Sequence, residues 1–269
     1  MNHPLSPETI RDSQQLVIEV FKSFREELMR SYGNIEHLAK HDGSPVTELD
    51  IRIEETLKNK LYEKYPEIGF QGEETGLAAN TSGALWIVDP IDGTSSFMHG
   101  LPYCTNMAGL VVDGVIVASV IYQFVSDDLY TALRGEGAYR NNERIHVKNT
   151  GLDDSIVFAG SFVYKNVYTI LRPYGIALYA PLGASGYEFT RLAQGSIQAV
   201  TKLHCGSKVH DNVPGVLLVE EAGGQIVSFE GNDYNYEATN FVAATPNVAR
   251  VVIDNHAEIL DIITQQSLT

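Results

Sequence analysis

The residues best suited to chemistry lie in one short segment, in which Asp89 and Asp92 stand three positions apart and Gly93 and Thr94 follow at once. The apolar run 84–88 directly before them is typical of a buried strand, so both carboxylates should stand at a strand end. Carboxylate oxygens suit hard divalent cations, and a glycine exposes backbone N–H groups that can hold phosphate. The segment therefore predicts a site for a divalent metal together with phosphate.

A two-metal site needs carboxylates from several elements, because each hard cation takes about six oxygen ligands. Glu73 and Asp211 extend the pair, since each lies at a predicted strand end or helix start. Each carboxylate also has a plain structural reading: Asp211 can cap a helix, Glu73 and Glu74 can form a solvated turn, and Asp89 can stabilise a turn before Pro90. The combination with a Gly-Thr pair favours the metal site.

Other kinds of site fit the sequence less well. An EF-hand needs ligands at alternate positions and a Glu six residues after its glycine, and His99 stands there instead. A glycosidase needs two carboxylates rather than four beside a Gly-Thr pair. The chain has no C-x-x-C, H-E-x-x-H, Walker-type loop or G-x-G-x-x-G, and its two cysteines are too few for a disulfide framework.

The composition is that of a globular protein with one large domain or two lobes: 269 residues, 44% hydrophobic and 20% charged. The net charge of −15 argues against nucleic acid as a partner, because phosphate backbones are bound by Lys and Arg patches. No apolar run approaches the roughly 18 residues of a membrane span. Residues 1–4 show no basic start of a signal peptide, so a cytoplasmic location is expected.

Two helices are predicted near the start of the chain. Ser6 can cap the first, and apolar residues continue at helical spacing as far as Leu28. The second is predicted over 47–65, where Thr47 and Asp50 have the spacing of a capping pair.

The remaining pattern divides the chain into two lobes, 1–148 and 149–269, with the boundary near 145–155. The first lobe is rich in strands, with a turn region over 135–142. The second lobe alternates strands and helices, which indicates an α/β arrangement. The predicted strands are 68–70, 84–88, 107–112, 115–124, 129–133, 156–159, 197–201 and 225–229, and the later helices are 187–194, 211–221 and 247–266.

Taken together, the motifs resemble the inositol monophosphatase family. The resemblance is carried by Gly-Glu-Glu at 72–74, by the aspartate motif within 86–97, and by Asp211 followed by Glu-Glu-Ala-Gly-Gly at 220–224. This family belongs to the Mg²⁺-dependent, lithium-sensitive sugar phosphatases, with fructose-1,6-bisphosphatase as a more distant relative. The resemblance implies a layered αβαβα sandwich, α+β in the N-terminal lobe and α/β in the C-terminal lobe, with the site at their junction.

The resemblance also implies a phosphomonoesterase that uses two or three Mg²⁺ ions, takes a small phosphorylated substrate, and forms a homodimer. The first ion would be held by Glu73, Asp89 and the carbonyl of Ile91, the second by Asp89, Asp92 and Asp211, and a weaker third with help from Glu73. Thr94, backed by Asp50, would orient and activate the attacking water. The implied residues are Thr94, Asp50 and Glu73 for catalysis; Glu73, Asp89, Ile91, Asp92 and Asp211 for metal; and Asp92, Gly93, Thr94, Gly183, Ala184, Ser185 and His204 for substrate.

The chain departs from the family pattern near Asp211. His210 stands where the family usually has Trp. It either packs or bonds nearby, which we favour, or touches substrate, and a metal-ligand role is disfavoured because the oxygen set is already complete. His204 stands where inositol-specific members tend to carry an acidic residue, which weakens the case for myo-inositol phosphate. Lys202 and Lys208 either favour a more anionic substrate or are plain surface charges. The segment 160–182 is short for the substrate-facing insert, so a more open pocket is expected.

The glycine-rich region 31–45, which carries Lys40, His41 and Asp42, is expected to be a mobile loop that can close over the third ion. Two further hypotheses stay open. One keeps the chemistry but changes the substrate to histidinol phosphate, fructose 1,6-bisphosphate or a 3′-phosphoadenosine nucleotide. The other is a non-catalytic regulatory protein on the same fold.

Overall fold

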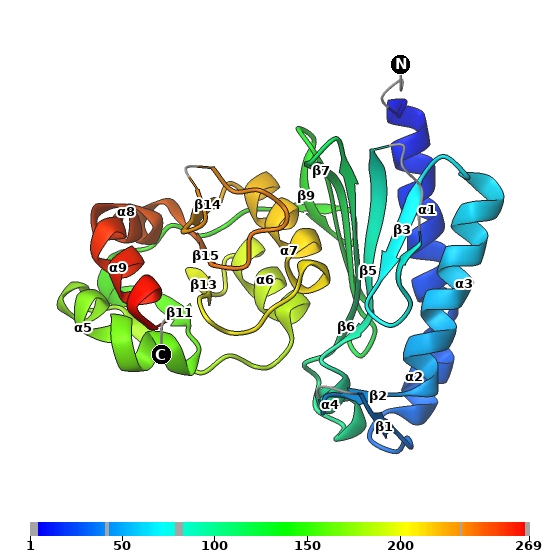
Figure 1. The fold of residues 1–269 in the computed structure, drawn as a ribbon, viewed down its shortest axis with the longest axis horizontal. Helices are drawn as coiled ribbons and strands as arrows, with labels where there is room; N and C mark the ends of the chain where they lie inside the picture. Colours follow the sequence, from blue (N-terminus) through cyan, green and yellow to red (C-terminus); the bar gives the residue numbers. More distant parts are fainter. Residues whose placement is uncertain (1–4, 41–42, 79–82, 232, 267–269) are drawn as a thin grey trace.

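The computed structural model describes residues 5–40, 43–78, 83–231 and 233–266, and its elements are drawn in Figure 1. Residues 1–4, where the absence of a signal peptide is predicted, lie outside these ranges. The helices are α1 (Pro7–Ser23), α2 (Arg25–Ser31), α3 (Glu48–Lys64), α4 (Thr94–Met98), α5 (Tyr168–Leu171), α6 (Ser185–Ala193), α7 (Val209–Glu221), α8 (Pro246–Asp254) and α9 (His256–Gln266). The strands are β1 (Leu38–Ala39), β2 (Pro45–Val46), β3 (Gly69–Gly72), β4 (Gly76–Ala78), β5 (Ala84–Asp92), β6 (Thr105–Val112), β7 (Val115–Gln123), β8 (Asp128–Leu133), β9 (Gly137–Arg140), β10 (Glu143–Ile145), β11 (Ile156–Phe158), β12 (Ala177–Tyr179), β13 (Ala199–Lys202), β14 (Gln225–Ser228) and β15 (Phe241–Ala244).

Two large sheets organise the described chain. The eight-stranded sheet has the order β10-β9-β8-β7-β6-β5-β3-β4 and is antiparallel except where β3 pairs with β5. The five-stranded sheet has the order β12-β11-β13-β15-β14, parallel at β12, β11 and β13 and antiparallel at β15. The interval between β10 and β11 contains our expected lobe boundary, and the division into lobes 1–148 and 149–269 stays our interpretation.

The elements stack in five layers, which Figure 1 shows edge-on. On one face of the large sheet, α1 packs on β7 and α3 packs on β5. Helices α6 and α7 lie between the sheets, where α7 contacts β6 and β7 on one side and β14 and β15 on the other. Helix α8 covers the outer face of the small sheet. The predicted α/β layered fold is therefore confirmed.

The layering explains why the first five residues of β5, 84–88, are all apolar. Trp86 and Val88 belong to the core beneath α1 and α3, whereas Ile87 belongs to the core beneath α6 and α7. All three side chains are completely buried. A strand covered on both faces has no solvent side, so polar residues do not alternate along it.

Several elements differ from the sequence predictions. The first helix does not run unbroken to Leu28, because Phe24 bends the chain between α1 and α2. The bend leaves Leu28 fully buried, so apolar spacing could not reveal it. The predicted helix 247–266 is likewise two helices, α8 and α9, separated at Asn255, whose side-chain amide donates to the Val251 carbonyl at 2.8 Å.

The predicted loop and turn regions also contain strands. Within 31–45, β1 and β2 pair as an antiparallel hairpin, and His41 and Asp42 lie outside the described residues. Within 135–142, the four residues of β9 pair with β8 and β10, although glycines and asparagines flank them. The strand β15 was not predicted at all.

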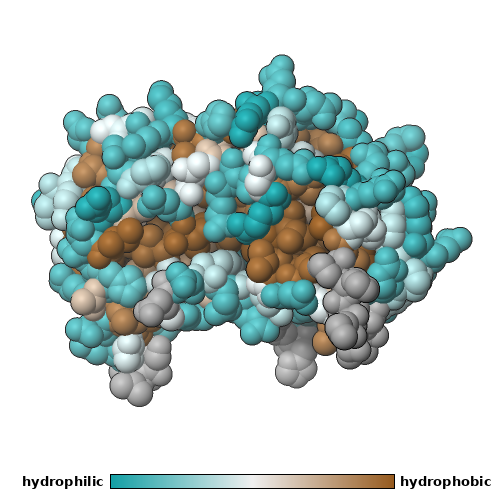
Figure 2. All heavy atoms as spheres, turned by 90° about the horizontal axis from the view of Figure 1, so that it is seen from above, coloured by the Kyte–Doolittle hydropathy of each residue, from teal (hydrophilic) through white to brown (hydrophobic). Residues whose placement is uncertain are grey.

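The surface combines hydrophilic and apolar regions. Figure 2 shows one face as mostly hydrophilic, with apolar surface across its middle. No helix among the residues described is long and apolar enough to span a membrane.

Candidate active site

A β-bulge at the end of β5 brings Asp89 and Asp92 to the same side of the sheet. Residues three apart in a regular strand point to opposite faces, but the pairing with β6 shifts register between these two aspartates. Pro90 fits the irregularity because it has no N–H to donate, and Asn106 donates to its carbonyl at 2.5 Å. As a result, carboxylate oxygens of Asp89, Asp92 and Asp211 lie within 4.8 Å of one another.

The turn after β5 depends on Gly93 and places Thr94 at the start of α4. Gly93 has φ +79°, and a Cβ there would stand 2.4 Å from the Tyr103 carbonyl oxygen, so both conformation and space require glycine. The Thr94 Oγ lies 2.9 Å from the carbonyl oxygen of Ile91 and 3.4 Å from Oδ1 of Asp50. Its single proton can go to only one of these acceptors at a time, and its lone pairs can accept from a water.

Asp50 combines its capping position with the contact to Thr94. Its Oδ2 accepts hydrogen bonds from the Thr47 N–H at 2.8 Å and from the Thr47 hydroxyl at 2.5 Å. These bonds fix the carboxylate at the start of α3 and leave Oδ1 for Thr94. The capping and water-positioning readings of Asp50 are therefore geometrically compatible.

The turn that presents Glu73 is held from behind by Glu54 of α3. Glu54 is fully buried and accepts the backbone N–H groups of Glu74 at 2.9 Å and Thr75 at 2.7 Å. A Cβ at Gly72 would stand 1.9 Å from the Glu54 carboxylate, so the Gly-Glu-Glu motif begins with glycine to admit this clamp.

The hairpin β1–β2 reaches the site through Lys40. The Nζ of Lys40 lies 2.6 Å from Oε1 of Glu73 and 2.5 Å from Oε1 of Glu74. His210 Nε2 stands 3.9 Å from the same Glu73 oxygen, and Glu73, Asp89 and His210 form a second group whose ligand atoms lie within 4.8 Å. His210 thus lies among the carboxylates rather than in an apolar wall.

The second half of the chain secures Asp92 through α6. Its Oδ1 accepts the Ser185 N–H at 2.9 Å, and its Oδ2 accepts the Gly186 N–H at 2.7 Å and the Thr105 hydroxyl at 3.1 Å. Asp211 comes from the first turn of α7, where one oxygen accepts the backbone N–H at the start of that helix. Asp211 therefore accepts a backbone hydrogen bond at the start of α7 and also belongs to the carboxylate cluster.

The carboxylates shift one another's acidity. Burial, together with the negative charges of Glu73, Asp92 and Asp211, raises the pKa of Asp89 well above its ordinary value. Burial and the charge of Asp211 raise the pKa of Asp92 to about 7, and burial raises the pKa of Asp50 to about 7. Burial also pushes the pKa of Glu73 upward, but hydrogen bonds with Lys40 and Asp89 and the positive charges of Lys40 and His210 together outweigh it, so that pKa lies below its usual value.

This arrangement fits bound divalent cations. Asp89 is 2% exposed, and its Oδ1 is buried with no hydrogen-bond partner in the part of the chain that the structure describes. A buried, unpartnered carboxylate oxygen among other acids is costly unless a cation compensates it. The donor set is mainly oxygen, as hard cations prefer, with the His210 nitrogen at one side.

A cavity of about 370 Å³ opens at this cluster. The sequence-predicted site residues that line it are Glu73, Asp89, Ile91, Asp92, Gly93, Thr94, Gly183, Ala184, Ser185 and Asp211. Asp50 stands behind Thr94 instead. His204 is not among the described lining residues: its ring lies 4.7 Å from that of Phe162, and its Nε2 stands 3.0 Å from the Ile263 carbonyl oxygen. The geometry therefore gives no support to substrate contact by His204.

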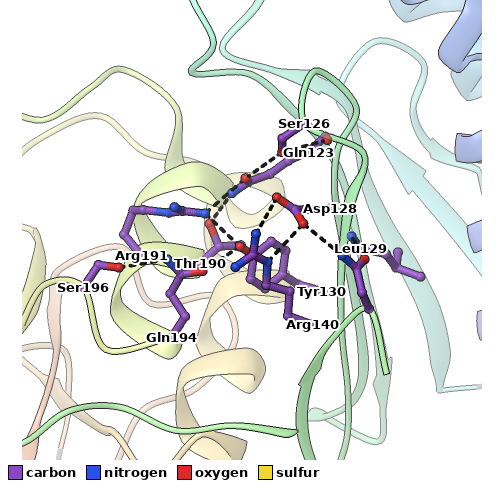
Figure 3. A network of polar contacts seen from close by, with 11 residues as sticks. Gln123, Ser126, Asp128, Leu129, Tyr130, Arg140, Thr190, Arg191, Gln194 and Ser196 are labelled. Atoms are coloured by element: carbon purple, nitrogen blue, oxygen red, sulfur yellow. Dashed lines mark hydrogen bonds and ion pairs between the residues drawn. The ribbon is translucent and has the colours of Figure 1, made fainter. Parts of the chain in front are cut away.

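Sequence reasoning missed the network that anchors α6 to the large sheet. Figure 3 shows Arg191 of α6 and Gln194, the C-cap residue of that helix, meeting Tyr130 of β8, with the Tyr130 hydroxyl 2.7 Å from each partner. Arg191 also donates to Gln123 Oε1 at 3.1 Å, and Gln123 Nε2 donates to Thr190 at 2.5 Å. These polar residues carry no local motif, so only the folded chain reveals that they fix the helix bearing Ser185 and Gly186.

Comparison with known proteins decides the family. The model of the inositol monophosphatase family matches residues 8–264. The chain belongs to this family. It is accordingly a phosphoric monoester hydrolase, as the resemblance implied.

Individual relatives agree with this membership. An inositol-1-monophosphatase of Rhizobium meliloti is 30% identical over 249 residues, which cover 88% of this chain and 92% of the relative. A Nus factor SuhB of Pasteurella multocida is 29% identical, covering 78% and 81%. The solved structure of the extragenic suppressor protein SuhB from Bartonella henselae is 26% identical with a TM-score of 0.78, covering 93% and 97%.

Proposed function

We propose that this phosphatase hydrolyses a small phosphorylated polyol or sugar, of the inositol 1-phosphate kind, with Mg²⁺ as its cofactor. One observation carries the proposal: a single cavity combines Oδ1 of Asp89, which has no hydrogen-bond partner among the residues described, with a Thr94 hydroxyl that lies 3.4 Å from Asp50. A cation site and a water-positioning hydroxyl are the two parts that metal-assisted hydrolysis needs.

Two or three ions would be held by the residues named from the sequence. Glu73, Asp89 and the Ile91 carbonyl would bind the first, and Asp89, Asp92 and Asp211 the second. Such ions neutralise the phosphate and lower the pKa of a bound water. Lys40 contacts Glu73 on the same oxygen that faces His210, so this ammonium must leave Glu73 before that oxygen binds a cation.

The chain's own groups would position the reactants. Thr94 would donate a hydrogen bond to the Ile91 carbonyl or to Asp50 and accept one from the attacking water. Glu73 would assist catalysis as a ligand of the first ion and of the weaker third ion. The backbone N–H groups of Gly93 and Thr94 would hold the phosphate, and residues 183–185 would contact the leaving alcohol.

A panel of phosphomonoesters assayed with and without Mg²⁺ tests the proposal. The panel includes inositol 1-phosphate, histidinol phosphate, fructose 1,6-bisphosphate and a 3′-phosphoadenosine nucleotide. Thr94→Val keeps the shape but removes the hydroxyl, so kcat should fall by about 10²–10⁴-fold. Thr75→Val is the control, since its side chain is exposed outside the cavity. Unchanged kcat in Thr94→Val refutes the assigned role.

A regulatory protein on this fold is the second candidate, because relatives named Nus factor SuhB match most of the chain. The retained carboxylate cluster argues for catalysis instead, since a binding protein does not need it. Absence of Mg²⁺-dependent turnover across the whole panel would favour the regulatory role. The homodimer and the cytoplasmic location are part of the same proposal, and light scattering on the purified chain tests the dimer.

A further inference from the structure

The cavity wall contains one buried positive charge. Lys202 ends β13, and among the lining residues that the structure describes it is the one lysine or arginine. Its side chain is 8% exposed, so it is no surface charge. The other charged lining residues are acids. Glu188 pairs with Lys202, and the cations of the proposed function would neutralise the rest, which are Glu73, Asp89, Asp92 and Asp211.

Lys202 is held rigidly by its neighbours. Its Nζ donates to Ser185 Oγ at 2.8 Å and stands 3.4 Å from Oε2 of Glu188, whose side chain is 2% exposed. The other Glu188 oxygen accepts the Leu182 N–H at 2.7 Å. A buried ion pair costs desolvation that an apolar pair avoids, so its presence here indicates a task other than packing.

The hydrogen-bonding capacity of this group is not exhausted. An ammonium has three N–H donors, and Ser185 and Glu188 take two of them. Nζ also lies 5.4 Å from the centre of the Phe189 ring. Among the residues described, no third oxygen or nitrogen atom accepts a hydrogen bond from Nζ. Because the Ser185 oxygen already accepts from Lys202, its own proton can be donated into the cavity. The wall therefore offers donors to an acceptor on the substrate.

We propose that Lys202, together with Ser185, is a specificity-determining residue that binds a second anionic group on the leaving alcohol. The preferred substrate is then a phosphomonoester whose alcohol also carries a phosphate or a carboxylate. The hydroxyl groups of a neutral polyol need hydrogen-bond acceptors on the protein as well as donors. The acid beside Lys202 is Glu188, and its two oxygens already accept hydrogen bonds from Leu182 and Lys202. This inference rests on the proposed phosphatase function and names its substrate class.

Matched substrate pairs test the inference on the full chain with Mg²⁺. The first pair is fructose 1,6-bisphosphate and fructose 1-phosphate, of which the former carries an additional phosphate. The second pair is 3-phosphoglycerate and glycerol 3-phosphate, of which the former carries an additional carboxylate. The wild type should show kcat/KM at least about tenfold higher for the doubly anionic member of one pair, as expected for a charge-assisted hydrogen bond. The responding pair identifies which anion is bound.

The double variant Lys202→Met with Glu188→Gln removes both charges of the pair, so that no unpaired carboxylate is left at position 188. Its ratio of kcat/KM within the responding pair should fall towards one. Lys60→Met is the matched control, because this lysine of α3 is exposed and does not line the cavity. It should keep the wild-type ratio.

Two outcomes overturn the inference. One is a wild-type ratio near one in both pairs. The other is a ratio that persists in the double variant, because a merely structural ion pair would cause an equal loss on both members of a pair. No Mg²⁺-dependent turnover of any phosphomonoester is a different failure, because it removes the proposed function itself and the inference with it.

Discussion

Asp89 stands in surroundings that destabilise the folded chain unless a cation is bound. Its carboxylate is buried near four other acids, Glu73, Asp92, Asp211 and Asp50, and Oδ1 has no partner among the residues described. Asp89→Asn removes this charge, so the metal-free protein should gain about 1 kcal/mol in free energy of unfolding. The same change should weaken Mg²⁺ binding by about tenfold or more, since a hard cation prefers a charged oxygen.

Urea unfolding in EDTA and calorimetric Mg²⁺ titration measure these two opposite effects. Asp261→Asn on the exposed surface of α9 is the control and should change neither quantity. A loss of stability in metal-free Asp89→Asn, or unchanged Mg²⁺ affinity, would contradict the role.

At this scale the sequence predicts which carboxylates converge but not what surrounds them. Glu73, Asp89, Asp92 and Asp211 converge in two groups that share Asp89, as expected, because each stands at a strand end or a helix start. The bulge that turns Asp89 and Asp92 to one side was not predicted. The burial of Lys202 could not be foreseen, since a lysine at a strand end is ordinarily exposed. It follows from how β13 and α6 pack together, which no local spacing encodes.

The turn between β5 and α4 allows a test of backbone geometry. Gly93 and Gly114 have nearly the same φ, +79° and +81°, but a Cβ at Gly114 would meet nothing within 4 Å. Alanine at either position should cost about 1–2 kcal/mol of unfolding free energy for the left-handed conformation. Gly93→Ala should cost more, because the Tyr103 carbonyl must also move. Equal losses in chemical unfolding would show that the close approach is unimportant.

The α6 network in Figure 3 makes a prediction for the junction of helix and sheet. Tyr130→Phe leaves the buried ring in place but removes the hydroxyl shared by Arg191 and Gln194. Unfolding free energy should fall by about 1–3 kcal/mol, because buried polar partners lose their bond. Tyr139→Phe, whose hydroxyl bond is exposed, should change it by less than about 0.5 kcal/mol. Similar values for the two variants would argue against a stabilising network.

Element boundaries show where pattern reading ends. The predicted helices and most strands lie close to their expected ranges because apolar periodicity reports which face is buried. Apolar periodicity does not reveal the breaks at Phe24 and Asn255, because buried residues continue on both sides of each break. The β1–β2 hairpin escapes it too, because its strands have two residues each and no apolar alternation.

When metal is removed, the stability of the whole molecule should fall as pH rises. This is the opposite of what is expected for a protein whose carboxylates have pKa values lowered by salt bridges. Asp50 and Asp92 have pKa values raised to about 7 from 3.8, and that of Asp89 is raised well above 3.8. Between roughly pH 4 and 7 the folded chain therefore holds protons that the unfolded chain has released. Since the folded state binds more protons, its stability falls as pH rises through this window.

Thermal unfolding in EDTA should accordingly give a Tm that decreases from about pH 5 to about pH 8, by several degrees if one or two protons are involved. Mg²⁺ replaces those protons with a cation, so it should raise Tm most at the high end and flatten the slope. Asp92→Asn has one fewer carboxylate to protonate, and its slope in EDTA should be smaller than that of the wild type. A Tm that rises with pH in EDTA would mean that the acid cluster is not protonated in the metal-free fold, and that ion pairs such as Lys40 with Glu73 and Glu74 compensate it instead.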